Sequence, residues 1–128
     1  MTPASPLADA CALLAFFAGA GPGADGLAAL RAGRTLVSAV TVWELTRKAA
    51  LGKLPPLPQV AGSFAGYLQA EGFVPLPLTW QDAEAANALP PIHKDPMDRM
   101  LIAQALRQDL PVITSDALFV GYGVTTIW

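Results

Sequence analysis

Apolar positions along the chain fall into two alternating kinds of segment: short continuous runs, and longer stretches in which apolar residues recur every three or four positions. The short runs predict strands at residues 6–8, 35–38, 73–77, 111–114 and 124–127. The longer stretches predict helices at residues 11–18, 27–32, about 42–51, 60–70, 82–89 and 96–108. Strands that alternate with helices indicate an α/β fold with a mainly parallel sheet covered on both faces.

Prolines refine this pattern at two strands. Pro75 and Pro77 predict an edge position for the third strand, because proline has no N–H to donate to a neighbouring strand. Pro3 and Pro6 weaken the first strand in the same way. The clearest helix is the last one, residues 96–108, whose apolar residues lie on or near one face.

The composition predicts a single domain, residues 1–128, which is long enough to bury a core. With 53% hydrophobic and 14% charged residues and a mean hydropathy of +0.42, the chain is unusually apolar. We therefore expect an apolar surface covered by a partner, most simply a second copy of the chain. The single cysteine, Cys11, excludes an internal disulfide and fits a reducing compartment, so we expect a cytoplasmic protein.

Charge and targeting signals exclude two further classes. The net charge of −2 argues against a strongly basic nucleic-acid coat protein but leaves a nuclease open, and Arg47, Lys48 and Lys53 predict a local basic strip. Residues 10–20 resemble the apolar part of a signal peptide. However, no Lys or Arg precedes them, Asp9 stands at their entrance, and the run is too short to cross a bilayer, so we expect no membrane association.

Four acidic residues occupy positions where an α/β sheet binds ligands. Asp9 and Asp116 follow predicted strands directly, and Glu44 lies in the first turn of the helix predicted after the second strand. Asp98 opens the last long helix. Ligands of open α/β sheets bind beyond the carboxyl ends of the strands, so these carboxylates are expected at one rim, with Asp98 joining them if its helix begins there.

Each acid also has a purely structural explanation. Thr41 and Glu44 match a capping box, Asp95 is a cap for the last helix, whose dipole favours an acid in its first turn, and Asp9 and Asp116 each precede a segment that they can cap. The combination favours chemistry, since four acids at one rim repel one another unless cations neutralise them. Oxygen ligands without paired His or Cys favour Mg²⁺ or Mn²⁺, which support phosphodiester cleavage.

Two segments resemble a known family. Residues 35–54, TLVSAVTVWELTRKAALGKL, resemble the second strand and helix of VapC-type PIN-domain toxins. Residues 89–126, LPPIHKDPMDRMLIAQALRQDLPVITSDALFVGYGVTT, resemble them more strongly through DPMDRMLIAQA and the strand that ends in TSD. The likeness covers residues 34–128 well and the start of the chain poorly.

The resemblance implies a three-layer α/β/α sandwich with a mainly parallel sheet of four to five strands. It implies an endoribonuclease that acts as the toxin of a type II toxin–antitoxin pair, cuts RNA with Mg²⁺ or Mn²⁺, forms a homodimer and is blocked by a small antitoxin. Family roles carry onto Asp9, Glu44, Asp98 and Asp116 as the acidic, metal-binding cluster. Thr114 or Ser115 would be the accompanying hydroxyl.

The start of the chain departs from the family pattern. Members usually open with an apolar strand running into Asp-Thr or Asp-Ser, whereas this chain has prolines before Asp9 and the hydroxyl-free Ala10 after it. This departure leaves an alternative open, a catalytically degenerate PIN fold that only holds an antitoxin or RNA. A receiver-like phosphoacceptor is a third hypothesis, but the paired acids after the first strand and the lysine after the last are not visible.

The remaining polar candidates have competing interpretations. For Arg47 and Lys48, one helical turn beyond Glu44, an RNA phosphate contact and a solvated helix face are both open. For Arg99 we expect a salt bridge with a neighbouring acid, with an RNA phosphate contact as the alternative. His93, in a Pro-flanked loop, is expected to be a solvated loop residue and not a general base.

Two further expectations concern apolar residues. Trp43 and Trp80 are interpreted as core or dimer contacts in preference to base-stacking platforms. Cys11 is expected to be a small buried residue and not a nucleophile, since no basic partner is evident.

Overall fold

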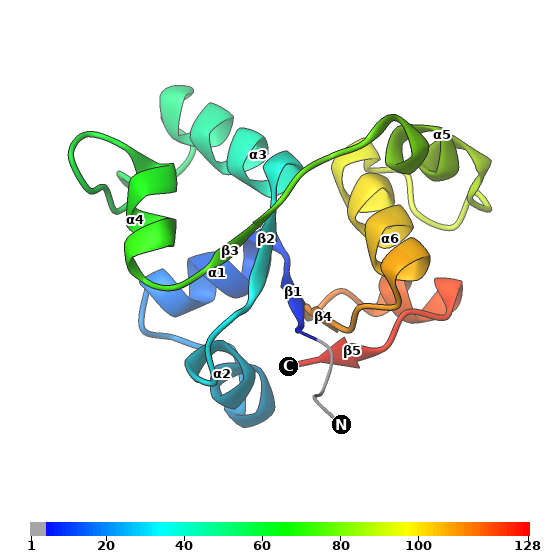
Figure 1. The fold of residues 1–128 in the computed structure, drawn as a ribbon, viewed down its shortest axis with the longest axis horizontal. Helices are drawn as coiled ribbons and strands as arrows, with labels where there is room; N and C mark the ends of the chain where they lie inside the picture. The colour runs from blue at the N-terminus through cyan, green and yellow to red at the C-terminus, as the bar shows by residue number, and fades with distance from the viewer. Residues whose placement is uncertain (1–4) are drawn as a thin grey trace.

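The computed structural model of the protein describes residues 5–128 (Figure 1). Its strands are β1 (Leu7–Ala8), β2 (Leu36–Ser38), β3 (Val74–Leu76), β4 (Val112–Ile113) and β5 (Thr126–Ile127). Its α-helices are α1 (Ala10–Phe17), α2 (Ala24–Arg31), α3 (Ala39–Ala50), α4 (Phe64–Ala70), α5 (Trp80–Ala88) and α6 (Pro96–Gln108). A 3₁₀ helix, η1 (Ala117–Tyr122), lies between β4 and β5.

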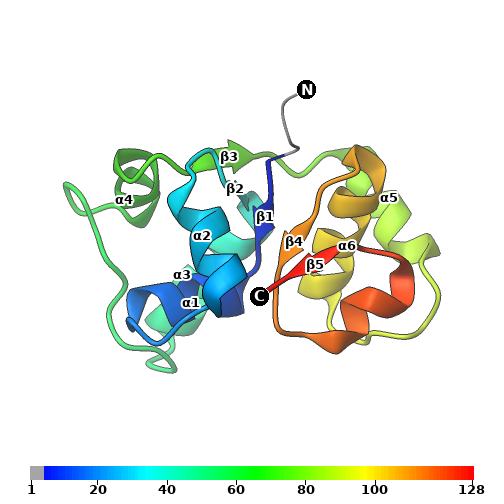
Figure 2. The same cartoon turned by 90° about the horizontal axis from the view of Figure 1, so that it is seen from below.

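The five strands form one parallel sheet in the order β3-β2-β1-β4-β5, with α1 to α4 on one side and α5, α6 and η1 on the other (Figure 2). This architecture confirms the predicted α/β/α sandwich. It also confirms the edge position of β3, the strand that contains Pro75.

Two apolar cores lie on the two faces of the sheet. Ala8 and Ile113 belong to the core beneath α1 to α4, whereas their chain neighbours Leu7 and Val112 belong to the core beneath α6 and η1. All four side chains are fully buried. Successive side chains of a strand point to opposite faces, so two-residue strands are enough to anchor both outer layers.

The first strand occupies the centre of the sheet in spite of its prolines. Its Leu7 N–H donates to the Pro111 carbonyl at 2.8 Å, and the Pro6 carbonyl accepts from the Leu36 N–H at 2.8 Å. Pro6 precedes the strand, so its missing N–H costs no bond within it. β1 has only two residues, as do β4 and β5, so its length does not single out an effect of the prolines. Pro3 lies outside the described residues.

Several helix starts differ from the prediction: α1, α2 and α5 begin one, three and two residues early, at Ala10, Ala24 and Trp80, and the starts of α3 and α4 have a clear cause. Helix α3 begins at Ala39, because the Ser38 hydroxyl at the end of β2 accepts from the Val40 N–H at 3.1 Å and caps the helix directly. Glu44 therefore lies in the second turn, and the predicted capping box from Thr41 to Glu44 is wrong. Helix α4 begins at Phe64, capped by the Ser63 hydroxyl, whereas residues 60–63 form a turn.

Within the described part of the chain, no helix combines the length and the apolar character needed to cross a membrane.

Candidate metal centre

Asp9 lies at the carboxyl end of β1 and has only 3% of its surface exposed. Its Oδ1 accepts a hydrogen bond from the Ala12 N–H at 2.8 Å and caps α1, as the structural interpretation predicted. Burial raises the pKa of its carboxyl, and the nearby charges of Asp116 and Glu44 add to the rise, against hydrogen bonds from the Thr114 hydroxyl and the Ala12 N–H. The charges of Asp116 and Glu44 therefore reach Asp9 in the fold.

The end of β4 contributes Thr114 and Asp116. The Thr114 hydroxyl is buried, accepts from the Asp116 N–H at 3.0 Å and lies close enough to the Asp9 carboxylate to lower its pKa. Asp116 Oδ1 accepts from the Leu118 N–H at 2.9 Å and caps η1. Ser115 is exposed. Of the two predicted hydroxyls, only Thr114 lies among the acids.

Asp98 lies in the first turn of α6, which begins at the same rim of the sheet. The Asp95 carboxylate fixes this start by accepting from the Met97 N–H at 2.8 Å and the Asp98 N–H at 3.3 Å, with Pro96 as the first helical residue. Burial, followed by the charge of Asp95, raises the pKa of the Asp98 carboxyl to about 7, and the Glu44 and Asp9 charges add to the rise while His93 opposes it. Asp98 therefore joins the other acids, as predicted.

Glu44 borders this group from α3. Its side chain is 12% exposed, and its Oε2 forms an ion pair with Lys48 Nζ at 2.7 Å, one helical turn away. Its negative charge raises the pKa of both Asp9 and Asp98. The four predicted acids thus share one electrostatic environment, although Asp9 and Glu44 lie around its margin.

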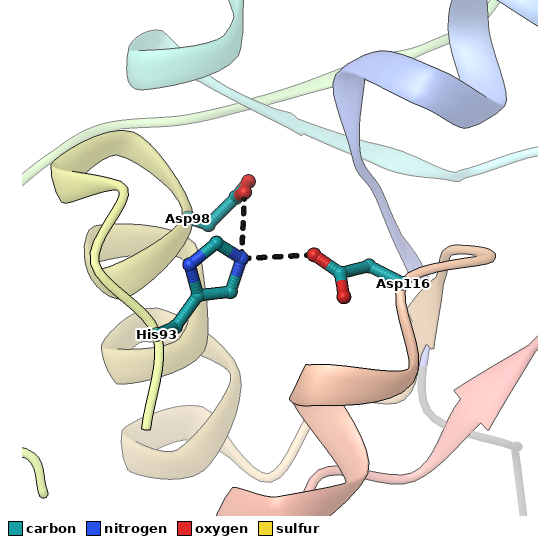
Figure 3. Close-up of side chains that lie close together, drawn as sticks. All are labelled: His93, Asp98 and Asp116. Carbon is teal, nitrogen blue, oxygen red and sulfur yellow. Dashed lines mark hydrogen bonds and ion pairs between the residues drawn. The ribbon is translucent and has the colours of Figure 1, made fainter. Parts of the chain in front are cut away.

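The expectation that His93 is a solvated loop residue is wrong. The imidazole is not solvated: its side chain is 10% exposed, and Nε2 lies 2.8 Å from Asp116 Oδ2 and 3.1 Å from Asp98 Oδ2 (Figure 3). The ring packs edge-on against Phe119 at a centroid distance of 6.2 Å. One feature of the sequence indicated that His93 could lie near the acids: it stands five residues before Asp98, in the segment that leads to the start of α6.

Within the described residues, His93, Asp98 and Asp116 form the group of potential metal ligands whose donor atoms all lie within 4.8 Å of one another. Two carboxylates at this spacing, with two more acids nearby, match the oxygen-rich surroundings that Mg²⁺ and Mn²⁺ prefer. The pKa of Asp98 is raised mainly by burial, and the charges of Asp95, Glu44 and Asp9 add to the rise, so a bound cation would stabilise the ionised carboxylate. The donor set therefore fits a divalent ion.

Arg99 has a different role from the predicted one. Its guanidinium donates to the backbone carbonyls of Ala86, Leu89, Pro90 and His93 at 2.8–3.1 Å. The expected salt bridge with an acid is wrong. A guanidinium group with its donors engaged in this way holds the loop between α5 and α6.

The predicted basic strip lies beside the acids. Arg47, Lys48 and Lys53 line a groove of about 200 Å³ that Glu44 and Asp95 also line. Next to it, an apolar pocket of about 240 Å³ is lined by residues of α3, α6 and the segment before α5, namely Ala39, Val40, Trp43, Leu78, Met97 and Met100.

Exposure decides part of the expectations about apolar residues. Trp43 is 54% exposed, with the Arg47 guanidinium 5.5 Å from its ring centre, and Trp80 is 87% exposed, so neither belongs to the core and the dimer contact stays a prediction. Cys11 is exposed, so its expected burial is wrong. Partial desolvation and the charges of Asp9 and Asp98 raise the pKa of the Cys11 thiol, which agrees with the expectation that it is no nucleophile.

Fold and site together define a class: a parallel α/β domain whose carboxylates gather at the carboxyl ends of its strands in an arrangement fit for divalent metal. A family model described as "PIN domain" matches residues 7–123, and the chain belongs to this family. PIN domains are generally nucleases that use divalent metal ions.

Solved structures agree with this fold. The chain is similar to one described as a toxin–antitoxin complex from Klebsiella pneumoniae, with a TM-score of 0.67, 20% identity and 97% of each chain covered. It is also similar to one described as FitAB bound to an IR36 DNA fragment, with a TM-score of 0.63, 18% identity, and 94% of this chain and 92% of the other covered. No curated protein matches the sequence significantly.

Proposed function

We propose that this chain, acting as a single PIN-like domain over residues 1–128, is a metal-dependent endoribonuclease and the toxin of a VapC-type toxin–antitoxin pair. One observation carries the proposal: the chain brings the carboxylates of Asp98 and Asp116 within reach of one imidazole nitrogen, next to the buried Asp9. Ordinary helix caps would not require the two carboxylates to converge.

Asp9, Glu44, Asp98 and Asp116 would hold Mg²⁺ or Mn²⁺, which polarises a phosphate and lowers the pKa of a bound water. The Thr114 hydroxyl lies close to both Asp9 and Asp116 and would help to orient them.

The basic groove supplies the substrate contacts. Arg47 and Lys48 lie beside Glu44 and would bind RNA phosphates, which would place the RNA strand across the acidic rim. Lys48 would exchange its bond with Glu44 for one with phosphate. Arg99 is not proposed as a phosphate contact, because the backbone carbonyls engage its guanidinium.

The test is RNA cleavage by purified protein in Mg²⁺ or Mn²⁺. Asp98→Asn and Asp116→Asn should each lower the cleavage rate at least about 100-fold, because each change removes a charged oxygen ligand. Asp109→Asn is the matched control: Asp109 ends the same helix as Asp98 at its opposite terminus, and Asn tolerates its left-handed backbone with φ of 54°. If Asp98→Asn cleaved as fast as Asp109→Asn, the proposal would be wrong.

For partners, we propose a small antitoxin protein and a second copy of the chain, and for location the cytoplasm. Two observations support a protein partner: the exposed apolar surface, which includes Trp43 and Trp80, and the similarity in fold to toxin–antitoxin complexes.

A further inference from the structure

The proton on the His93 imidazole can be placed from its hydrogen bonds. The Asp95 N–H donates to Nδ1 at 3.2 Å, so Nδ1 presents its lone pair and Nε2 carries the hydrogen. Nε2–H therefore donates a hydrogen bond to Asp116 Oδ2 at 2.8 Å, and the same nitrogen lies 3.1 Å from Asp98 Oδ2. A ring nitrogen that carries hydrogen has no lone pair to give to a metal.

The loop that carries His93 is held from two distant elements. The Tyr122 hydroxyl, at the end of η1, accepts from the N–H groups of Ile92 and His93 at 3.1 and 2.7 Å and donates to the Pro90 carbonyl at 2.7 Å. Arg99, on α6, donates to the carbonyls of Pro90 and His93 at 3.0 and 3.1 Å. These bonds hold the loop in place, and the imidazole lies between the two acids (Figure 3).

We propose that His93 is a positioning residue of the metal centre: its Nε2–H holds the Asp116 carboxylate by a hydrogen bond, and the ring, which lies against the Asp98 carboxylate, sets the gap between the two acids. The proposal rests on the proposed function, since it assigns the two carboxylates to a divalent ion. The hydrogen bond uses one oxygen of Asp116, and the contact with Asp98 involves one oxygen of that carboxylate, so further oxygen lone pairs remain for the ion. Hydrogen bonds that orient ligating carboxylates in this way commonly account for about 10- to 100-fold of metal affinity.

The chemistry of imidazole suits this role better than that of the other donors. Lys or Arg in this place would bring a permanent positive charge against the acids and compete with the cation. A neutral Nε2–H donates a hydrogen bond and leaves the negative charge of the pair available to the metal. The oxygen-based preference for Mg²⁺ or Mn²⁺ is then retained although a histidine lies in the cluster.

The first measurement is Mn²⁺ affinity by calorimetry on the full chain without an affinity tag. His93→Ala should weaken Mn²⁺ binding about 10- to 100-fold. His93→Gln keeps an N–H donor and should recover most of the affinity, which a residue that only fills space would not do. Equal affinity in the parent, His93→Ala and His93→Gln would overturn the proposal.

The second measurement does not depend on a variant that folds. The chain contains one histidine, so any imidazole nitrogen bonded to Mn²⁺ must belong to His93. Electron spin-echo spectra of Mn²⁺ bound to the parent protein should lack the ¹⁴N coupling of a directly bonded imidazole. Such a coupling would show that His93 is a ligand and would overturn the positioning role while leaving the metal centre intact. Absence of Mn²⁺ binding to the parent would overturn the proposed function as well.

Discussion

Capping and metal binding, which the sequence presents as alternatives for the acids at the strand ends, do not exclude each other in the structure. Asp9 Oδ1 accepts from the Ala12 N–H, and Asp116 Oδ1 accepts from the Leu118 N–H. Each cap fixes one oxygen of the carboxylate and thereby orients the other. Capping and metal binding are therefore compatible in one side chain, and a good capping position is no argument against a site.

Residues that depend on distant partners could not be predicted. Asp9, Glu44, Asp98 and Asp116 could be proposed from the sequence because strand ends and helix starts can be located from local sequence. The place of His93 depends on Tyr122, 29 residues further along, and on the guanidinium of Arg99. Arg99 was expected to pair with an acid because it follows Asp98, but α6 directs it toward the carbonyls at the end of α5.

The metal-free protein should become less stable as the pH rises from about 4 to about 7. The pKa of Asp98 is about 7 in the folded protein, whereas its ordinary value, which applies to the unfolded chain, is 3.8. Between these two values the folded state holds a proton that the unfolded chain has released. The free energy of unfolding then falls with pH through this window, and the loss is complete above pH 7. Urea denaturation in EDTA at pH 5, 6, 7 and 8 measures this slope.

Substituting Asp98 gives the control for this titration. Asp98→Asn cannot ionise, so it should flatten the slope and be more stable than the parent at pH 8 in EDTA. Asp109→Asn should keep the slope of the parent, since Asp109 lies at the other end of α6. A steep slope that persists in Asp98→Asn would assign the titration to another group.

At the level of elements, the predictions succeeded where the signals were local. Helix α6 matches its predicted bounds because Asp95 and Pro96 mark its start and the chain turns left-handed at Asp109. Helix α3 was predicted three residues late because Ser38 serves both as the last residue of β2 and as the cap, with no loop between them. All five strands were located, but each was predicted longer than it is, since apolar runs continue beyond the paired residues.

The cap of α6 should contribute measurably to stability. Asp95→Ala removes the acceptor of the Met97 and Asp98 N–H groups and should lower the free energy of unfolding by about 1 kcal/mol in urea denaturation. Asp95→Ser keeps an oxygen at the cap and should recover most of that loss.

Both substitutions have a second effect that separates charge from capping. The charge of Asp95 helps to raise the pKa of Asp98, so either change should shift the stability slope in EDTA to lower pH. If Asp95→Ser lost as much stability as Asp95→Ala, the side-chain cap would not be the cause. If neither moved the slope, the Asp95 charge would not act on Asp98.

On the scale of the whole molecule, the high hydrophobic content is only partly explained by the two cores. They fill both faces of the sheet, yet Trp43, Trp80 and Val120 remain 54%, 87% and 58% exposed. The described residues thus form a folded domain that leaves a considerable apolar surface exposed. Acids, basic groove and apolar pocket adjoin one another around α3 and the start of α6, so a partner on the apolar surface near Trp43 would also restrict access to the acids.

The exposed apolar surface around Trp80 can be tested as the interface of the expected homodimer. A tryptophan as exposed as Trp80 contributes nothing to the core of a monomer, and burying it between two copies would contribute about 2 kcal/mol or more per copy. We therefore expect a dimer in sedimentation velocity at micromolar concentration, and Trp80→Glu should weaken the association at least about 10-fold. Val120→Glu, an equally drastic change at an exposed position on η1, should leave it unchanged. A parent protein that stays monomeric would contradict the homodimer and leave the apolar surface to the antitoxin, whereas an unchanged association of Trp80→Glu would place the interface elsewhere than around Trp80.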